Sequence, residues 1–323
     1  MFTALIPVHN RGELLDRLLD TIGRQTFSFA EVVVIDNLST DGAAALARAR
    51  GCRVIEMGEN AGFARAVNRG WRAAATEWVA ILNSDVELDP RWLERLHDAI
   101  GNAACATGLI LDAADRSSVD GTYDLVSRAA CAWRAGKGER AGIERSPAPI
   151  AIVPGTACIF RRDVLEQLGG FDERYGSYLE DVDLGLRCLR LGLSGLYVPE
   201  AVAYHHGSAT LGRWHPNVVR LISRNQLLLI SRHYDRALFR SCFWPILAGQ
   251  LLWGIVAWRH GAARAWLQGK REALRGFRLE GTPSAPLRNF LMASEREIRH
   301  RARGPYWRWY FRLTHPRLRN AAH

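Results

Sequence analysis

Several features that mark particular protein classes are missing from this chain. Its six cysteines are scattered and form no C-x-x-C pair, which argues against zinc and against a disulfide framework. No G-x-G-x-x-G follows the first predicted strand, so a dinucleotide dehydrogenase is disfavoured, and no Walker lysine loop is found. There is no internal repeat. We expect the cysteines, most of which have apolar neighbours, to be buried free thiols in a reducing cytoplasm.

A leader and a long apolar run are also missing. Thr3–Val8 is predicted to be a core strand within a few residues of Met1, which leaves no room for a signal peptide. The run Phe243–Trp258 has sixteen mostly apolar residues, whereas a membrane span needs about twenty. With three Trp and a following Arg-rich segment, it is predicted to be a helix in the headgroup region. The alternative is a buried helix of a bundle.

The net charge of +10 is confined to the C-terminal part of the chain. Residues 1–258 carry 28 Lys and Arg against 29 Asp and Glu, and residues 259–323 carry 15 against 4. This distribution argues against a basic groove for nucleic acid and predicts a tail that meets an anionic membrane surface. Residues 305–312 mix aromatic residues with arginines, a composition that could bind nucleic acid. Because this segment follows an apolar helix, we expect the membrane surface to be its partner instead.

Short apolar runs alternate with helical periods along the first hundred residues, which predicts an α/β fold with a mixed, mostly parallel sheet flanked by helices. The predicted strands are Thr3–Val8, Glu31–Asp36, Arg53–Met57, Trp78–Leu82, Ala104–Leu111 and Gly195–Val198. The predicted helices are Glu13–Arg24, Asp41–Arg50, Ala61–Ala75, Trp92–Ile100, Asp163–Leu168, Asp181–Leu191 and Asn217–Tyr234. Residues 112–149 are predicted to form a loop or hairpin excursion.

Two acidic clusters and a histidine pair carry the chemistry of the chain. The apolar strand that ends at Leu82 is followed by Asn83–Glu87, a second cluster lies at Glu180–Asp183, and His205–His206 comes after another apolar segment. Ligands of open α/β sheets bind beyond the carboxyl ends of strands, and carboxylates with a histidine suit a divalent cation and a base. The competing interpretation is that these acids are helix caps and solvated loop ends.

Two turns have the composition of a nucleotide site. In the first, Asp36–Gly42, acceptor groups can take the imide N–H of uracil or thymine, and Ser39 or Asp41 can cap the next helix. In the second, Asn60–Gly70, Gly62 permits close backbone approach and Arg65 can face a diphosphate.

The ordered set of motifs resembles the family-two inverting glycosyltransferases with the GT-A fold, in particular the rhamnosyltransferase-like branch. The matching strings are IPVHNR (6–11), VVVIDNLSTDG (32–42), NAGFARAVNRG (60–70), ILNSDVELDP (81–90), GTACIFRRDVLEQLGGFDERY (155–175), YLEDVDLGLRCLRLG (178–192) and YHHGSAT (204–210). The resemblance covers about residues 3–235, which would form the catalytic domain. Residues 236–323 would form a basic, Trp- and Arg-rich helical region associated with the membrane surface.

The resemblance implies the following donor-binding residues: Pro7, His9, Arg11, Asp36, Asn37, Asn60, Gly62, Arg65, Asn68, Asn83, Ser84 and Asp85. Among them Asp36 would recognise the base. Asp85 matches the last acid of the family's D-x-D metal motif, and Asn83 replaces the first acid. Asp85 would therefore bind Mg²⁺ or Mn²⁺ almost alone, with His205 as second ligand. His206 is the alternative ligand, since adjacent side chains point apart, and a purely structural histidine is a further alternative.

The resemblance also implies Asp181 as general base, which would deprotonate an acceptor hydroxyl as it attacks C1 of the donor sugar and inverts that centre. Glu180 is the alternative base, or orients the acceptor, and Asp183 is expected to cap or pair. Processive members carry Q-x-x-R-W, and here Arg213-Trp214 is preceded by Thr210, so we expect transfer of one or a few sugars.

Together these features predict a cytoplasmic enzyme, peripheral at the inner face of the plasma membrane. It would move a sugar from a nucleoside diphosphate donor to a glycan or polyprenyl-linked acceptor. The resemblance to the rhamnosyltransferase-like branch alone implies dTDP-rhamnose as donor before UDP- or GDP-sugars. One alternative is a GT-A-like module that binds a nucleotide sugar without catalysis. The other is a sugar nucleotidyltransferase, which would need a Gly-rich basic phosphate loop where Val8–Arg11 stands.

Overall fold

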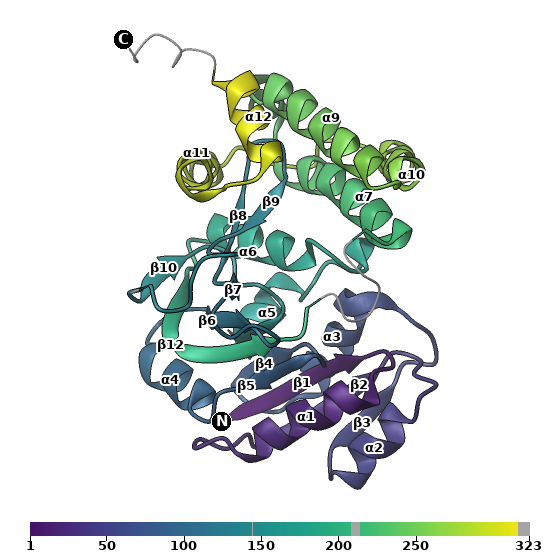
Figure 1. Ribbon diagram of the computed structural model, residues 1–323, viewed down its shortest axis with the longest axis vertical. Coiled ribbons are helices and arrows are strands. Elements are labelled where there is room, and N and C mark those ends of the chain that lie inside the picture. Colours follow the sequence, from purple (N-terminus) through teal and green to yellow (C-terminus); the bar gives the residue numbers. More distant parts are fainter. Residues whose placement is uncertain (144, 208–213, 316–323) are drawn as a thin grey trace. The chain divides into compact units, whose positions relative to one another are not determined.

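The computed structural model describes residues 1–143, 145–207 and 214–315 (Figure 1). The chain forms two compact units. The first contains Met1–Asp124 and Gly136–Thr210, and the second contains Leu125–Ala135 and Leu211–His323. The predicted domain boundary after residue 235 differs from this division, because the helix that follows residue 215 and a short segment from the middle of the chain both belong to the second unit.

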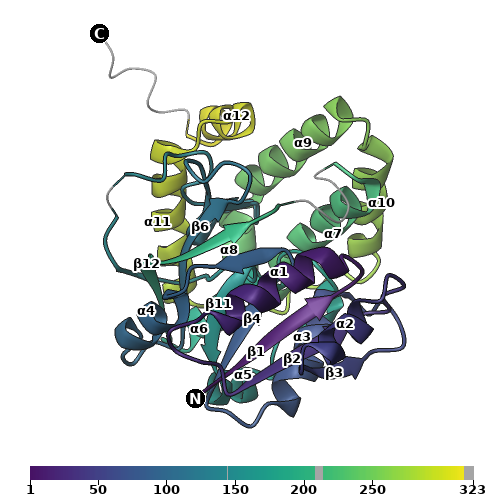
Figure 2. The same cartoon turned by 60° about the horizontal axis from the view of Figure 1, so that its bottom comes forward.

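A ten-stranded mixed sheet forms the centre of the first unit (Figure 2). Its strands are β1 (Phe2–Val8), β2 (Glu31–Asp36), β3 (Arg53–Glu56), β4 (Trp78–Leu82), β5 (Val86–Leu88), β6 (Cys105–Asp112), β7 (Val119–Gly121), β10 (Ala148–Ile150), β11 (Ala157–Arg161) and β12 (Gly195–His205). The order is β10-β12-β6-β11-β4-β1-β2-β3, with β5 paired to β12 and β7 to β6. The predicted mixed sheet is therefore confirmed.

The first four strands of the chain run parallel, so they end at the same edge of the sheet. β1 lies between β2 and β4, with Val8 opposite Asp36 and Leu5 opposite Ile81. β11 lies antiparallel between β4 and β6, and β12 runs parallel to β6. The polar residues that follow Val8, Ile35 and Leu82 are thereby brought to one rim.

Helices cover both faces of the sheet. They are α1 (Gly12–Gly23), α2 (Ala43–Ala49), α3 (Gly62–Ala73), α4 (Trp92–Ala99), α5 (Arg162–Leu168) and α6 (Glu180–Arg190), with a 3₁₀ turn at Glu173–Tyr175. Ala4, Ile6 and Val8 of β1 belong to one apolar core with α1, α2 and α4. Leu5 points to the opposite face, into a second core with α3, α5 and α6, as the alternation of side chains along a strand requires.

The sequence predicted most of these elements well, and two segments less well. The bounds of β2 and β4 are as predicted, whereas β12 continues seven residues beyond the predicted end at Val198 because a bulge between Val198 and Val202 lets it keep pairing with β6. The predicted excursion at 112–149 contains β7, β10 and the pair β8 (Asp124–Val126) and β9 (Ala132–Arg134).

The second unit is a helical assembly. It consists of the β8–β9 hairpin and α7 (Pro216–His233), α8 (Arg236–Ser241), α9 (Phe243–Arg259), α10 (Ala263–Leu274), α11 (Ala285–Arg301) and α12 (Pro305–Thr314). Val219, Ala257 and Ala265 form a small core that Trp253 and Trp266 complete. Within the described residues, no helix combines the length and the apolar character that a membrane crossing requires. The six cysteines are free, and all but Cys52 are buried, as expected.

The pairing of β6 with β12 allows a test of the fold. A Cβ atom on Gly108 in β6 would collide with the backbone carbonyl of Ala201, so Gly108→Ala should lower the free energy of unfolding by more than about 3 kcal/mol. Urea unfolding measures this. Gly23→Ala is the matched control, because a Cβ there meets nothing within 4 Å, and an equal loss in both variants would contradict the close approach of the two strands.

Candidate active site

Two neighbouring loops at the rim of β1 and β2 are held together by backbone and side-chain hydrogen bonds. Asn10 donates its N–H to Ser39 Oγ at 2.8 Å and accepts from the Thr40 N–H at 2.8 Å. The His9 ring Nδ1 lies 2.9 Å from the Asn37 carbonyl oxygen. These hydrogen bonds join the loops after Val8 and Asp36 into one continuous wall. The bonded residues are 28 to 30 positions apart in the sequence.

Asp36 and Asn37 bond to different parts of the structure in this wall. Asp36 is only 7% exposed, and its Oδ1 accepts the Ser39 N–H at 3.1 Å. The amide of Asn37 accepts from the Ala61 N–H at 2.9 Å and donates to the Gly62 carbonyl at 3.2 Å. Asn37 thus fixes the start of α3 beside the loop that carries Asp36.

The other residues predicted to bind the donor lie at or near this rim, with one exception. Pro7 is in β1 opposite Ile35, and Arg11 begins α1 with its side chain exposed. Asn60 Oδ1 accepts weakly from the Gly62 N–H at 3.4 Å. A side chain at Gly62 would press against the backbone of Gly176, so only glycine fits there.

Arg65 is exposed on α3 and is already engaged by acidic neighbours. Its guanidinium lies 2.6 Å from Glu59 Oε1 and 3.4 Å from Glu173 Oε2. A diphosphate that recruited Arg65 would therefore have to compete with two carboxylates.

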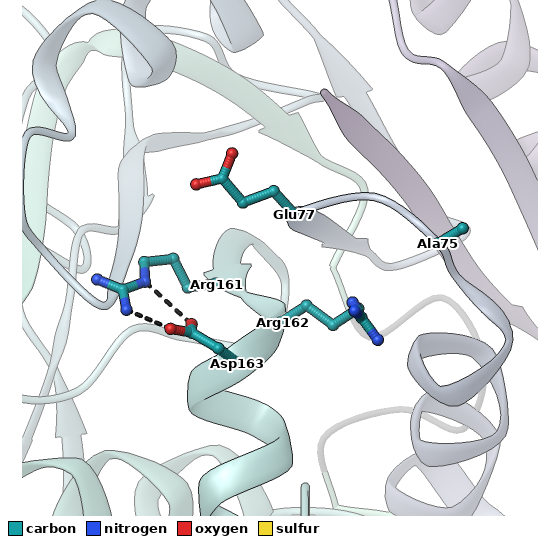
Figure 3. A pocket seen from close by; sticks show the side chains of 5 residues that line it. All are labelled: Ala75, Glu77, Arg161, Arg162 and Asp163. Atoms are coloured by element: carbon teal, nitrogen blue, oxygen red, sulfur yellow. Dashed lines mark hydrogen bonds and ion pairs between the residues drawn. The ribbon is translucent and has the colours of Figure 1, made fainter.

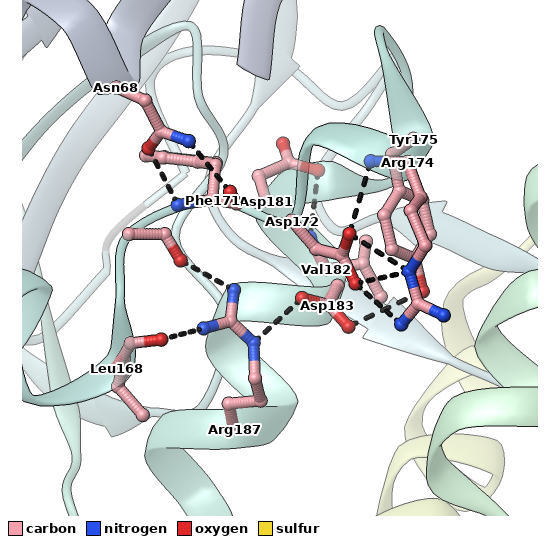
Figure 4. Close-up of polar contacts among 11 residues, drawn as sticks. Asn68, Leu168, Phe171, Asp172, Arg174, Tyr175, Asp181, Val182, Asp183 and Arg187 are labelled. Atoms are coloured by element: carbon pink, nitrogen blue, oxygen red, sulfur yellow. Dashed lines mark hydrogen bonds and ion pairs between the residues drawn. The ribbon is translucent and has the colours of Figure 1, made fainter. Parts of the chain in front are cut away.

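Asn68 is the exception, because the structure places it inside the fold. It is 1% exposed, and its Nδ2 donates to the Phe171 carbonyl at 2.8 Å while its Oδ1 accepts the Phe171 N–H at 2.9 Å (Figure 4). Nδ2 also donates to Glu173 Oε1 at 2.9 Å, and Oδ1 also accepts from Trp71 Nε1 at 3.0 Å. These bonds join α3 to the loop before α6. Asn68 supports the position of that loop, and its amide has no capacity left over for a ligand.

Asn83, Ser84 and Asp85 form the turn between β4 and β5, and Asp85 meets a residue from the far end of the unit. Asp85 Oδ1 lies 3.4 Å from His205 Nε2, and both side chains are largely buried. β5 is antiparallel to β12, with Val86 opposite His205, and this register brings the two side chains together. The structure therefore joins the two predicted metal ligands, which stand 120 residues apart in the numbering.

The second ring nitrogen of His205 has a partner that the sequence did not reveal. His205 Nδ1 lies 2.9 Å from Asp120 Oδ2, and the other oxygen of Asp120 forms an ion pair with Lys137. Burial by itself lowers the pKa of His205, but the hydrogen bonds with Asp120 and Asp85 outweigh it and raise the pKa to about 9. Burial raises the pKa of Asp120, and the bonds from His205 and Lys137 outweigh it and hold that pKa below its ordinary value.

His206 points away from Asp85. Its Nε2 lies 2.9 Å from Glu87 Oε1, and Arg116 approaches the other oxygen of Glu87 at 3.6 Å. The expectation that adjacent histidines face different ways is met, and His205 is the one that faces Asp85.

The two residues fit a divalent cation as a partial ligand set. Two ligands of one Mg²⁺ or Mn²⁺ lie about 3 Å apart, close to the 3.4 Å between Asp85 Oδ1 and His205 Nε2. A metal-bound histidine usually gives its other N–H to a carboxylate, which is the place of Asp120. In the part of the chain that the structure describes, no group of three or more His, Cys, Asp or Glu side chains is arranged to hold a metal ion. Donor phosphates and water would have to complete the coordination.

Two acidic residues begin α6, and the fold treats them differently. Glu180 is 6% exposed, and its Oε2 has no hydrogen-bond partner among the described residues. Burial and then the neighbouring charge of Asp181 raise the pKa of Glu180 well above its usual value, which disfavours its charged form. Asp181 is more accessible, and its Oδ2 accepts the Gly155 N–H at 2.9 Å.

The segment Gly155-Thr156 connects Asp181 to the turn that carries Asp85. While Gly155 binds Asp181, the Thr156 carbonyl accepts the Asn83 N–H at 2.9 Å. Tyr178 supplies a second link, because burial and then the charges of Glu180 and Asp85 raise its pKa. The predicted base, Asp181, therefore lies at the same rim as Asp85 and His205.

Behind this rim, an arginine fixes the backbone that precedes α6 (Figure 4). Arg187 donates to Asp183 Oδ2 at 2.7 Å, to the Leu168 carbonyl at 2.9 Å and to the Gly170 carbonyl at 2.8 Å. Asp183 is fully buried and pairs with Arg187, as expected, so it holds α6 in place from beneath.

Backbone strain gathers at the same rim. Among described non-glycine residues of the first unit, positive φ angles occur at Asn10 (62°), Arg11 (68°), Leu38 (69°), Tyr178 (70°) and Leu179 (68°). The first three lie in the loops after β1 and β2, and the last two immediately precede Glu180. Such conformations cost free energy and are concentrated at functional sites in proteins, which supports this rim as the site.

A hollow of about 410 Å³ lies at the opposite edge of the sheet (Figure 3). It is lined by Ala75, Glu77, Arg161, Arg162 and Asp163. Arg161 stands opposite Trp78 at the beginning of β4, whereas the acidic turn follows the end of β4. Arg161 and Asp163 of this hollow form an ion pair with each other. None of the five residues that line the hollow belongs to the candidate site.

The sequence is similar to known glycan-building enzymes. The model of the family described as glycosyl transferase family 2 matches residues 3–169. An N-acetylglucosaminyl-diphospho-decaprenol L-rhamnosyltransferase of Mycobacterium tuberculosis (strain H37Rv) is 31% identical over 242 residues, which cover 65% of this chain and 79% of that protein. The pre-mycofactocin glycosyltransferase of the same organism is 29% identical over 219 residues, which cover 66% of this chain and 44% of the relative.

Solved structures show the same fold. The mannosyltransferase PcManGT from Pyrobaculum calidifontis, in complex with GDP-Man and Mn²⁺, has a TM-score of 0.52 at 20% identity and covers 97% of this chain and 84% of its own. GalNAc-T7 with UDP, GalNAc and Mn²⁺ has a TM-score of 0.58 at 15% identity, covering 86% and 58%. These likenesses confirm the predicted GT-A architecture.

The His205–Asp120 pair predicts a pH dependence of stability in the absence of a divalent cation. The pKa of His205 in the folded protein, about 9, exceeds the ordinary value of 6.5. The protonated pair should therefore add about 3 kcal/mol to the free energy of unfolding below pH 6.5, and this contribution should disappear as the pH rises through about 9.

Urea unfolding at a series of pH values measures this contribution. Asp120→Asn should remove most of the dependence between these pH values, while Glu87→Gln, beside the neighbouring His206, should leave it unchanged. A histidine resonance of His205 that titrates near its ordinary value would contradict the assigned contacts.

Proposed function

The chain belongs to glycosyl transferase family 2, and we propose that it transfers a single sugar, with inversion, from a nucleoside diphosphate donor to a glycan or lipid-linked acceptor. The observation that carries this proposal is the gathering of Asp85, His205 and Asp181 at the rim where the parallel strands end. An acceptor carried by a membrane lipid would place the enzyme at the inner face of the plasma membrane.

We propose dTDP-rhamnose as the donor. A relative that is 31% identical over 242 residues is named an L-rhamnosyltransferase, which supports rhamnose before other sugars. The buried carboxylate of Asp36 would accept the imide N–H of a thymine or uracil ring, and the wall formed by Asn10, Asn37 and Ser39 would hold the nucleoside against it. UDP- and GDP-sugars are the alternatives that the donor screen below separates.

Asp85 and His205 would hold a divalent cation, with Asp120 keeping the His205 ring oriented so that Nε2 faces Asp85. Bound there, Mg²⁺ or Mn²⁺ would offset the negative charge that develops on the departing diphosphate. Because His205 must be neutral to bind a cation, the ring that Asp85 and Asp120 hold protonated has to release a proton first.

Asp181 would act as the general base. The acceptor oxygen attacks C1 of the donor sugar, the bond from C1 to the diphosphate oxygen breaks on the opposite face, and the hydroxyl proton passes to Asp181. Asp181 Oδ2 accepts the Gly155 N–H at 2.9 Å and Oδ1 accepts the Val182 N–H at 2.8 Å, and these two bonds fix the orientation of the carboxylate. Glu180 is a poorer candidate, because burial raises its pKa and so disfavours the charged form that a general base needs.

A thermal-shift screen of nucleoside diphosphate sugars tests donor and cation together. The donor with Mn²⁺ should raise the melting temperature more than either alone, since ligand at about 100 times its Kd adds about 2.7 kcal/mol of stability. Asp85→Asn should abolish the part that depends on Mn²⁺. Asp98→Asn, an exposed acid on α4, is the control, and an unchanged Mn²⁺ effect in Asp85→Asn would remove Asp85 from the proposed site.

The two acids of α6 are separated by a pair of isosteric variants. Asp181→Asn should lower kcat by about 10²- to 10⁴-fold and leave the donor-induced thermal shift intact, because it removes the proton acceptor and keeps the shape. Glu180→Gln should keep most of the activity, since burial raises the pKa of Glu180 and disfavours the charged form that the substitution removes. Single-turnover assays give the rates. The reverse result, with Glu180→Gln inactive and Asp181→Asn active, would transfer the role to Glu180.

A further inference from the structure

One face of α9 is apolar and exposed along the whole helix. Eleven of the sixteen large apolar side chains exposed among the described residues belong to the second unit, and six of these belong to α9. The six are Phe243, Trp244, Leu247, Leu251, Ile255 and Trp258, which we call the α9 stripe. Their spacing places them within about one third of the helix circumference. No charged residue occurs in α9 before Arg259.

The opposite face of α9 packs within the second unit. The core of that unit therefore already has its share of the helix, and the stripe is the face left outside it. Gln250 donates to the Ala129 carbonyl at 2.7 Å, and Gly249 packs against the Ala129 side chain. Ile246 and Ala257 are buried on this side. One face of α9 is thus buried, as the predicted bundle helix would be, and the other face is exposed.

The stripe continues onto both neighbouring helices. A hollow of about 220 Å³ is bordered by Phe243, Leu247 and Leu251 of α9 together with Leu274 of α10, and its walls are apolar side chains and the alkyl parts of Gln250 and Lys270. At the other end, Trp244 donates its indole N–H to the Leu313 carbonyl of α12 at 3.0 Å. The apolar face therefore spans three helices and contains a depression deep enough for part of a hydrocarbon chain.

The second unit carries a large excess of positive charge. The second unit contains 23 Lys and Arg against 5 Asp and Glu. Seven exposed arginines lie on α8, α9, α10 and α12 and form no ion pair with any acidic residue in the described part of the chain: Arg240, Arg259, Arg264, Arg271, Arg275, Arg308 and Arg312. A second copy of this chain would bring equal charge and be repelled, whereas an anionic surface would be attracted.

We propose that the α9 stripe docks on a bilayer that contains anionic lipid. The helix has 17 residues and is about 25 Å long, and it lies along the membrane surface with its apolar side in the acyl region. Trp244 and Trp258, near its two ends, occupy the interface that indole rings prefer, and the arginines of α10 and α12 meet lipid phosphates. The proposal concerns the second unit alone and does not depend on the sugar transferred.

Vesicle co-sedimentation of the full chain tests the proposal. The wild-type protein should bind vesicles of phosphatidylcholine with phosphatidylglycerol, bind pure phosphatidylcholine more weakly, and be released by salt. Leu251→Asp with Ile255→Asp should weaken binding by at least about tenfold, because both side chains are 53% exposed in the stripe. Met292→Asp is the matched control, an apolar side chain 44% exposed on α11 of the same unit.

Near-ultraviolet circular dichroism of each variant shows that the fold is retained, and size-exclusion chromatography with light scattering gives the oligomeric state. The proposal is overturned if the wild-type protein does not bind anionic vesicles, if the stripe variant binds as well as the wild type, or if Met292→Asp loses binding equally. It is also overturned if the wild-type protein is a dimer that the stripe variant converts to monomers, since the face would then join two copies. Trp258→Phe should in addition reduce quenching of tryptophan fluorescence by brominated lipid, because Trp258 is 70% exposed.

Discussion

The candidate site depends on holding several carboxylates close together in a partly buried place without leaving their charges uncompensated. Buried carboxylates are costly unless they are paired or protonated. The structure provides for both solutions: His205 stands between Asp85 and Asp120, Lys137 pairs with the far side of Asp120, and burial raises the pKa of Glu180, which favours its protonated form. Because some of these carboxylates are paired and another is favoured in its protonated form, several acids can lie at one rim. The imidazole between two carboxylates is the position where a cation could replace a proton.

The sheet supplies the geometry that this arrangement needs. Because β11 runs antiparallel between β4 and β6, Thr156 stands beside Asn83, and the backbone that supports Asp181 is continuous with the end of the strand that leads to Asp85. The bulge in β12 shifts its register on β6 and lets the strand reach His205, opposite Val86. Two long-range pairings, neither of them local in sequence, therefore set the distances between the predicted functional groups.

The sequence was sufficient for features encoded locally and insufficient for those that depend on long-range packing. The β-branched run of β2 and the apolar run of β4 gave correct bounds, since each forms a buried strand in its own right. Asp120 could not be found, because it lies in a polar excursion without periodicity and gains meaning only from its contact with His205, 85 residues away. Asn68 was assigned to the donor from its motif, whereas its amide contacts protein on every side, a distinction that only burial reveals.

The two units have net charges of opposite sign, so they interact differently with anions. The first unit carries 20 Lys and Arg against 28 Asp and Glu, so a nucleoside diphosphate approaches a net negative surface. Arg65 is already paired with Glu59 and Glu173, and His205 is shared by two carboxylates. In the proposed mechanism, the positive charge that a diphosphate requires would be supplied by a divalent cation that enters with the donor, because it would add two charges where the protein offers ligands. The second unit, by contrast, carries 23 Lys and Arg against 5 Asp and Glu, so most of its positive charge has no acidic counterpart in the same unit, which suits the proposed attachment to an anionic surface.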